Sequence, residues 1–206
     1  MENPAADVAD YGYLLHVPTM HAAQELEPIT VEDYLAGEPL SEVRHEYIGG
    51  VVYAMTGANR EHNTLAGNLF AALHDHLRGK PCEVFMADLK VRLEVVREDI
   101  FYYPDVAVAC DPRDTDRYFI RYPKVLIEVL SPDTERLDRR EKFLSYAQIE
   151  TLEEYVLVAQ DKAEVTVFRR AAQWQPEVSR QPAQMLRLVS LDFSLPLSEV
   201  YEGVKV

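Results

Sequence analysis

The sequence is poor in cysteine and in long hydrophobic runs, and both shortages restrict what the protein can be. Cys82 and Cys110 are the only cysteines among 206 residues, and neither has the spacing of a zinc-binding pair. Each lies in a strand-like stretch, so we expect two reduced, buried thiols in a cytoplasmic protein, with a disulfide as the alternative. No uninterrupted apolar run approaches the roughly 20 residues that span a bilayer, so no membrane segment is expected. Residues 1–10 lack the basic start and apolar stretch of a secretory signal.

Basic residues are also scarce. The chain has 21 Lys and Arg against 35 Asp and Glu, a formal charge of -14. Such a balance opposes binding to a phosphate backbone, which depends on Lys and Arg. The basic residues are unevenly spread, however, and a group of them lies between positions 113 and 142: Arg113, Arg117, Arg121, Lys124, Arg136, Arg139, Arg140 and Lys142. We therefore keep nucleic acid as a candidate substrate, since a metal site would neutralise some of the acid.

The length and the pattern of the chain indicate one folded domain. Residues 1–28 show no periodicity and predict a loosely ordered arm, in which Met20 is an alternative start. Residues 29–206 are enough to bury one core, and about half of the whole chain is apolar. We therefore expect a single domain over 29–206.

Local signals predict a mixed α/β domain, with a central sheet flanked by helices. A capping pattern at Thr30 predicts a short helix, and apolar residues at helical spacing predict a second over 63–77. A third is expected over 135–149, capped by Asp133 or Thr134. Gly49-Gly50 and Asp161-Lys162 predict hairpin turns. The expected strands are 45–48, 51–55, 83–86, 89–95, 105–109, 125–130, 155–159 and 165–169, with weaker ones near Trp174 and Leu186.

Three acidic residues sit in or beside these apolar strands, where a charge needs a partner. Glu46 lies in the first hairpin, Asp105 follows Pro104 at a strand start, and Glu128 lies within Ile127-Glu128-Val129-Leu130. A carboxylate in such surroundings is protonated, hydrogen-bonded or bound to a cation. Several together suggest a hard divalent metal held by oxygen atoms. That chemistry indicates metal-assisted hydrolysis, with phosphodiesters as the leading substrate class.

Each acid also has a simpler structural explanation. Asp105 can be an ordinary turn aspartate, because proline belongs at the start or edge of a strand. Glu128 lies in a strand that reads as buried on both faces, so a salt bridge to Arg or Lys would also satisfy it. Glu46 can form a cross-strand pair. The residues alone leave these explanations open.

Several side chains could assist such a site. Lys142 shares a helix face with Arg139 and Tyr146, and could orient or deprotonate an attacking water; otherwise it is a solvated lysine paired with Asp138. His62 at a helix start is most simply a capping or surface histidine, with proton transfer as the alternative. Lys90 competes with Lys142 for the catalytic position.

The order of these segments resembles the Uma2 family (DUF820), a domain of unknown function related to restriction endonucleases. The resemblance covers about residues 29–201. It rests on Tyr103-Pro104-Asp105-Val106, Ile127-Glu128-Val129-Leu130-Ser131-Pro132, Asp138-Arg139-Arg140-Glu141-Lys142 with Tyr146, and Glu153-Glu154-Tyr155-Val156-Leu157-Val158.

The resemblance implies the PD-(D/E)XK restriction-endonuclease-like fold and phosphodiester cleavage with Mg²⁺, for which Mn²⁺ can substitute. Carried over by motif, Asp105 and Glu128 are metal ligands together with the backbone carbonyl of Val129, and Glu46 is an accessory acid. The motif expects lysine two residues after Glu128, where this chain has Leu130. The resemblance assigns that role to Lys142 on the following helix.

Two classes of function follow. The first is a Mg²⁺-dependent endonuclease acting on DNA, with a homodimer expected by analogy because cutting two strands needs two sites. The second is a catalytically silent nuclease-fold scaffold that binds a protein or nucleic-acid partner. Another metal-dependent hydrolase is a third option. The sequence does not distinguish DNA from RNA, and it contains no separate recognition domain.

Overall fold

The computed structural model describes residues 27–55, 57–131, 135 and 137–206. Most of the predicted arm, with Met20, lies outside these residues, as do the predicted helix caps Asp133 and Thr134. Within the described part of the chain, no helix combines the length and apolar character needed to cross a bilayer.

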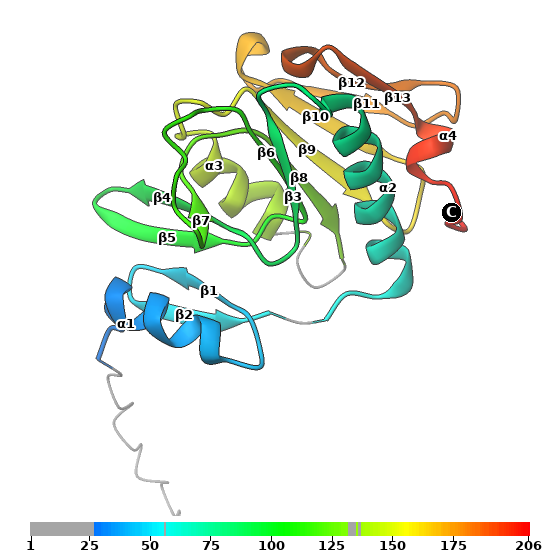
Figure 1. Ribbon diagram of the computed structural model, residues 1–206. Coiled ribbons are helices and arrows are strands. Elements are labelled where there is room, and N and C mark those ends of the chain that lie inside the picture. The colour runs from blue at the N-terminus through cyan, green and yellow to red at the C-terminus, as the bar shows by residue number, and fades with distance from the viewer. Residues whose placement is uncertain (1–26, 56, 132–134, 136) are drawn as a thin grey trace, which may run out of the picture.

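A six-stranded mixed sheet forms the centre of the molecule (Figure 1). Its strand order is β11-β10-β9-β8-β6-β3, and only β8 and β9 run parallel. The bounds are β3 Glu83–Met86, β6 Val106–Ala109, β8 Pro123–Leu130, β9 Glu154–Ala159, β10 Val165–Arg169 and β11 Pro176–Ser179. The apolar run around Glu128 is therefore a central strand, as its sequence predicts.

A five-stranded sheet, ordered β2-β1-β5-β4-β7, carries the first predicted hairpin. Its strands are β1 His45–Ile48, β2 Val51–Ala54, β4 Lys90–Val95, β5 Glu98–Tyr102 and β7 Phe119–Ile120. Gly49 and Gly50 have φ values of 55° and 93°, which glycine adopts without steric cost. The predicted turn between β1 and β2 is thus confirmed. A two-stranded sheet pairs β12 Met185–Leu188 with β13 Phe193–Pro196.

The first helix begins at its predicted cap, and the second begins close to its predicted start. Thr30 caps α1 Val31–Gly37 by accepting a hydrogen bond from the backbone of Asp33. Asn59 caps α2 Arg60–Leu77, which therefore starts three residues before the predicted position. Where one α-helix is expected over 135–149, a π-helix, η2 Leu137–Lys142, continues into α3 Phe143–Tyr146. The remaining helical elements are η1 Glu38–Leu40, η3 Arg170–Ala172, η4 Val189–Leu191 and α4 Leu197–Val200.

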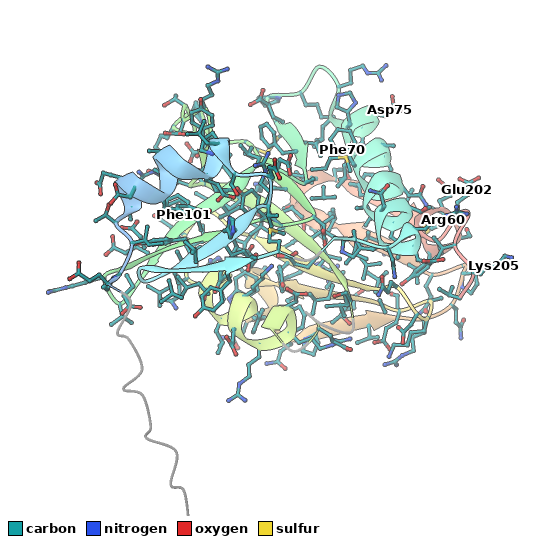
Figure 2. The ribbon with its side chains drawn as sticks, turned by 90° about the horizontal axis from the view of Figure 1, so that it is seen from below. Arg60, Phe70, Asp75, Phe101, Glu202 and Lys205 are labelled. Carbon is teal, nitrogen blue, oxygen red and sulfur yellow. A yellow bond between two sulfur atoms is a disulfide. The ribbon has the colours of Figure 1, made fainter. Side chains whose placement is uncertain are left out.

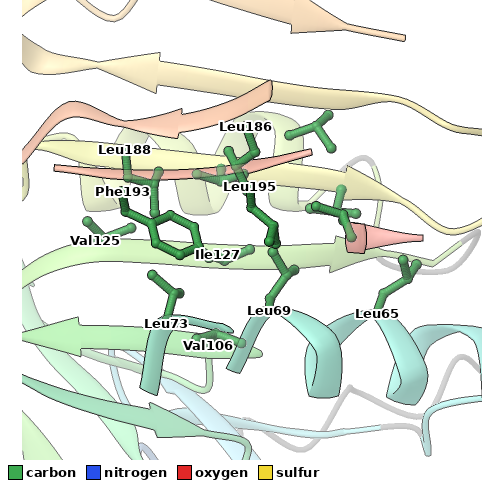
Figure 3. Close-up of a cluster of buried hydrophobic side chains, with 14 of the residues drawn as sticks. Leu65, Leu69, Leu73, Val106, Val125, Ile127, Leu186, Leu188, Phe193 and Leu195 are labelled. Atoms are coloured by element: carbon green, nitrogen blue, oxygen red, sulfur yellow. The ribbon is translucent and has the colours of Figure 1, made fainter. Parts of the chain in front are cut away.

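The core lies on both faces of the six-stranded sheet. Leu65, Leu69 and Leu73 of α2 point toward the sheet residue Ile127 and the β12–β13 pair (Figure 3). Each of the three leucines is fully buried, so α2 owes much of its stability to this packing. Tyr146 of α3 belongs to a second buried cluster. The sheet between these layers holds β8, and with it Glu128, in a fixed position.

Cys82 and Cys110 form a disulfide, so the expectation of two reduced thiols is wrong. Glu83 pairs with Ala109 across the β3–β6 ladder, and the two cysteines come next along it with their Cα atoms 4.1 Å apart. Among the described residues no free cysteine remains, and the bonded sulfur atoms are drawn in yellow in Figure 2. The thiol-based reason for a cytoplasmic location therefore no longer applies.

Candidate functional site

A cleft of about 790 Å³ brings most of the predicted site residues together. It lies where the β1–β2 hairpin, the start of α2, the start of β6, the end of β8 and η2 meet. Its lining includes Glu46, His62, Asp105, Glu128 and Lys142. A second pocket of about 430 Å³, beside the disulfide, contains none of the predicted residues.

The ammonium group of Lys142 sits among three carboxylates. Its Nζ lies 2.8 Å from Glu46 Oε1, 3.4 Å from Glu128 Oε1 and 3.3 Å from Asp138 Oδ1. All four side chains are less than 10% exposed. Burial opposes the lysine charge, but Glu128, Glu46 and Asp138 outweigh it and raise the pKa of Lys142 well above its ordinary value. Lys142 is therefore not the solvated surface lysine considered as an alternative, although it does pair with Asp138.

Two polar partners of Glu128 lie on the following helical segment. The hydroxyl of Tyr146 donates to Glu128 Oε1 at 3.2 Å, and Lys142 approaches the same oxygen. Burial raises the pKa of Glu128 well above its usual value, although the charge of Lys142 lowers it. Arg139 instead pairs with Glu135 at 2.7 Å and does not join this group. The salt bridge proposed as the structural explanation for Glu128 is thus present, and the proposed catalytic lysine forms it.

Asp105 links the start of β6 to β8 and to α2. Its Oδ2 accepts a hydrogen bond from the backbone N–H of Val129 at 2.6 Å and lies 3.3 Å from His62 Nε2. Burial lowers the pKa of His62, but the hydrogen bond and charge of Asp105, with a hydrogen bond to the Val129 backbone, raise it overall. The His62 side chain lines the cleft, where its ring nitrogen approaches Asp105. The capping role at this helix start belongs to Asn59, which accepts from the His62 backbone.

Lys90 belongs to a different buried group. Its Nζ lies 3.4 Å from the hydroxyl of Tyr103, which donates to Glu38 Oε1 at 2.9 Å. Burial lowers the pKa of Lys90. This group touches the cleft only through Tyr103, whose backbone N–H donates to Glu46 Oε1 at 3.3 Å. The structure thus places Lys142, and not Lys90, beside Glu128.

Sequence reasoning overlooked three polar residues at or near the cleft: Glu38, Asp138 as a site residue, and Gln160. Asp138 had a usable signal, because it lies four residues before Lys142 on one helical segment. Glu38 is in the short η1 turn and Gln160 directly follows β9, and nothing in their local sequence marks either one.

Several of the basic residues between positions 113 and 142 pair with acidic side chains. Arg113 pairs with Asp111, Lys124 with Glu153, and Arg139 with Glu135 and Glu164. The lining of the cleft is strongly acidic. Against the basic residues Arg44 and Lys142 it has six acidic ones: Glu42, Glu46, Asp88, Asp105, Glu128 and Asp138.

The donor chemistry of the cleft suits a hard divalent cation, because six of its lining residues carry carboxylates. Over the described residues, however, no set of three or more His, Cys, Asp or Glu side chains converges as a metal-binding group. A cation here would therefore need backbone or amide oxygens in addition to the acids.

The fold is that of restriction endonuclease-like proteins. The crystal structure of a "putative nuclease belonging to DUF820" from Anabaena variabilis superposes on this chain with a TM-score of 0.70 at 19% identity. The match covers 85% of this chain and 98% of that one.

Residues 31–198 match the Uma2 family model, which is described as "Putative restriction endonuclease". The chain belongs to this family. Two uncharacterized proteins of Synechocystis sp. are similar to it. The protein slr1290 is 35% identical over 179 residues, covering 85% of this chain and 93% of that protein. The protein sll1609 is 33% identical over 135 residues, covering 64% of this chain and 75% of that protein.

Proposed function

We propose that the protein is a metal-dependent endonuclease that hydrolyses phosphodiester bonds in DNA. The observation that carries the proposal is the cluster of buried acids: Glu46, Glu128 and Asp138 all lie within 3.4 Å of Lys142 Nζ, and Asp105 lines the same cleft. In the proposal Asp105, Glu128 and the Val129 carbonyl hold Mg²⁺ or Mn²⁺, with Glu46 as an accessory acid. When bound, the cation offsets charge on the scissile phosphate and activates the attacking water.

The chain's own residues have distinct tasks in this proposal. Lys142 supplies the positive charge that positions the nucleophile and faces the developing negative charge. Its approach to Glu128 from η2 supports a lysine that has moved from position 130, where buried Leu130 packs in the apolar core. Tyr146 steadies Glu128 through its hydroxyl, and His62 steadies Asp105.

Cleavage of supercoiled plasmid DNA in the presence of Mg²⁺ or Mn²⁺ tests the proposal. Asp105→Asn and Glu128→Gln keep the shape of each side chain and remove its charge, so both should abolish cutting while circular dichroism shows an intact fold. Glu153→Gln, at the exposed partner of Lys124, is the matched control and should cut normally. If both site variants cut as fast as the parent, the assignment is wrong. A parallel assay on single-stranded RNA decides between the two nucleic acids.

A catalytically silent scaffold is the second candidate function. Leu130 at the usual lysine position, and the existing salt bridges between Lys142 and the acids, favour it. Calorimetric titration with Mg²⁺ and Mn²⁺ discriminates, because a scaffold without a metal site would bind neither ion. A homodimer is also part of the endonuclease proposal, and a monomeric sedimentation profile with plasmid present would contradict it.

A further inference from the structure

The side chain of Gln160 is a buried polar group to which the proposed function assigns no role. It directly follows β9 and is only 9% exposed. Its Oε1 has no hydrogen-bond partner within the described part of the chain. An amide oxygen can only accept, so leaving it buried and unpaired costs stability unless a donor or a cation fills the gap.

The sheet register places Gln160 beside the proposed ligand strand. β8 and β9 run parallel with Leu130 opposite Ala159, so Gln160, the residue after β9, lies at the end of the strand pair that carries Glu128 and Val129. Gln160 lines the same cleft as Glu128, Val129 and Lys142. A bound group at the end of β8 would therefore lie within reach of both strands.

The cationic side chains of the cleft are already engaged elsewhere. Lys142 contacts three carboxylates, and Arg44 lies 3.6 Å from Asp88 Oδ1 and donates to the backbone oxygens of Glu38 and Ser41. Among the described residues, neither of these two cationic side chains therefore supplies the partner that Gln160 Oε1 lacks.

We propose that the Gln160 amide oxygen is a further ligand for a hard divalent cation in this cleft, an inference that rests on the proposed function. Amide oxygens are regular ligands of such ions. Among the described residues, the acidic and histidine side chains do not by themselves converge as a group of three donors, so a neutral oxygen beside them would complete the set. Gln160 also adds a ligand without adding charge to a cleft that is already strongly acidic.

Isothermal titration calorimetry of the full-length protein with MnCl₂ and with MgCl₂ tests this inference. Gln160→Met removes the oxygen and keeps the side-chain length, and it should weaken cation binding about tenfold or more. Gln160→Glu replaces the amide with a carboxylate and should strengthen binding. Gln148→Met is the matched control, since that glutamine is exposed and its side-chain amide donates to the Leu144 carbonyl away from the cleft, and the affinity of this variant should equal the parent's.

The outcomes separate this inference from the proposed function. An unchanged cation affinity in Gln160→Met overturns the ligand role. If that variant also melts at a lower temperature in metal-free buffer, the role of Gln160 is structural. A parent protein that binds neither ion overturns both ideas. If the parent and its variants bind as expected but none cuts DNA, the Gln160 assignment stands and the endonuclease proposal fails.

Discussion

Replacing Lys142 with methionine would remove an ammonium group that faces three buried carboxylates. Methionine nearly matches the lysine stem in length and is apolar, so the change isolates the charge. In the parent, Nζ lies within 3.4 Å of Glu46, Glu128 and Asp138, and none of these side chains is more than 9% exposed. Breaking a buried pair from one side costs about 3–5 kcal/mol, because the remaining charge is left without compensation.

Urea unfolding followed by circular dichroism measures that loss. For a domain of this size it corresponds to a fall in melting temperature of about 6–20 °C. Lys124→Met is the matched control, since Lys124 forms a partly exposed pair with Glu153 whose removal should cost about 1 kcal/mol or less.

The pH dependence gives this prediction a specific signature. In the parent, the raised pKa of Lys142 keeps the ammonium charged across the neutral range, and its contribution is lost only in alkali. Without it, burial favours the protonated form of Glu128 in the folded state, so the folded protein binds more protons than the unfolded chain. The stability of Lys142→Met should then fall as pH rises from about 4 toward 8. A loss below about 1 kcal/mol, or an equal loss at pH 5 and pH 8, would refute the buried-charge reasoning.

Three further perturbations test other parts of the molecule. Asp105→Asn should lower the pKa of His62, so the imidazole resonance in an NMR titration should shift at lower pH than in the parent; an unchanged midpoint would mean that the two side chains do not interact. Since protonated His62 pairs with Asp105, its contribution should be present in acid and disappear as pH rises through the raised pKa. The double change Cys82→Ser with Cys110→Ser opens a loop between positions 28 residues apart and should lower the free energy of unfolding in urea by about 3–4 kcal/mol. A parent protein whose unfolding does not change when a reductant is added would contradict the disulfide. Leu69→Ala should cost about 2–5 kcal/mol, because Leu69 is fully buried under the sheet; a change under 1 kcal/mol would show that α2 packs loosely.

Features set by neighbouring residues were predictable from the sequence. The apolar run around Glu128 predicts a central strand because only a strand covered on both faces tolerates so many Val, Ile and Leu residues. Gly49-Gly50 predicts the hairpin, because both positions need positive φ. The resemblance to Uma2 identified the family. Each of these signals is contained within a short stretch of chain or in the order of such stretches.

Other features were not predictable because they depend on which strands become neighbours. The β3–β6 register aligns Cys82 with Cys110. Their positions in the sequence did not predict that register, so the disulfide was not predicted, and no free cysteine remains among the described residues. The π-helical turn of η2 also departs from the regular helix that the pattern over 135–149 predicts.

The chain by itself determined which acids need a partner, because burying a carboxylate among apolar residues is costly wherever the strand lies. Only the tertiary structure decided what those partners are. It brought Lys142 to Glu46 and Glu128 and His62 to Asp105. It also placed Gln160 in the same cleft, with an amide oxygen that has no hydrogen-bond partner among the described residues. Electrostatic contacts depend on distances of a few ångströms between residues far apart in sequence, and only the folded packing sets those distances.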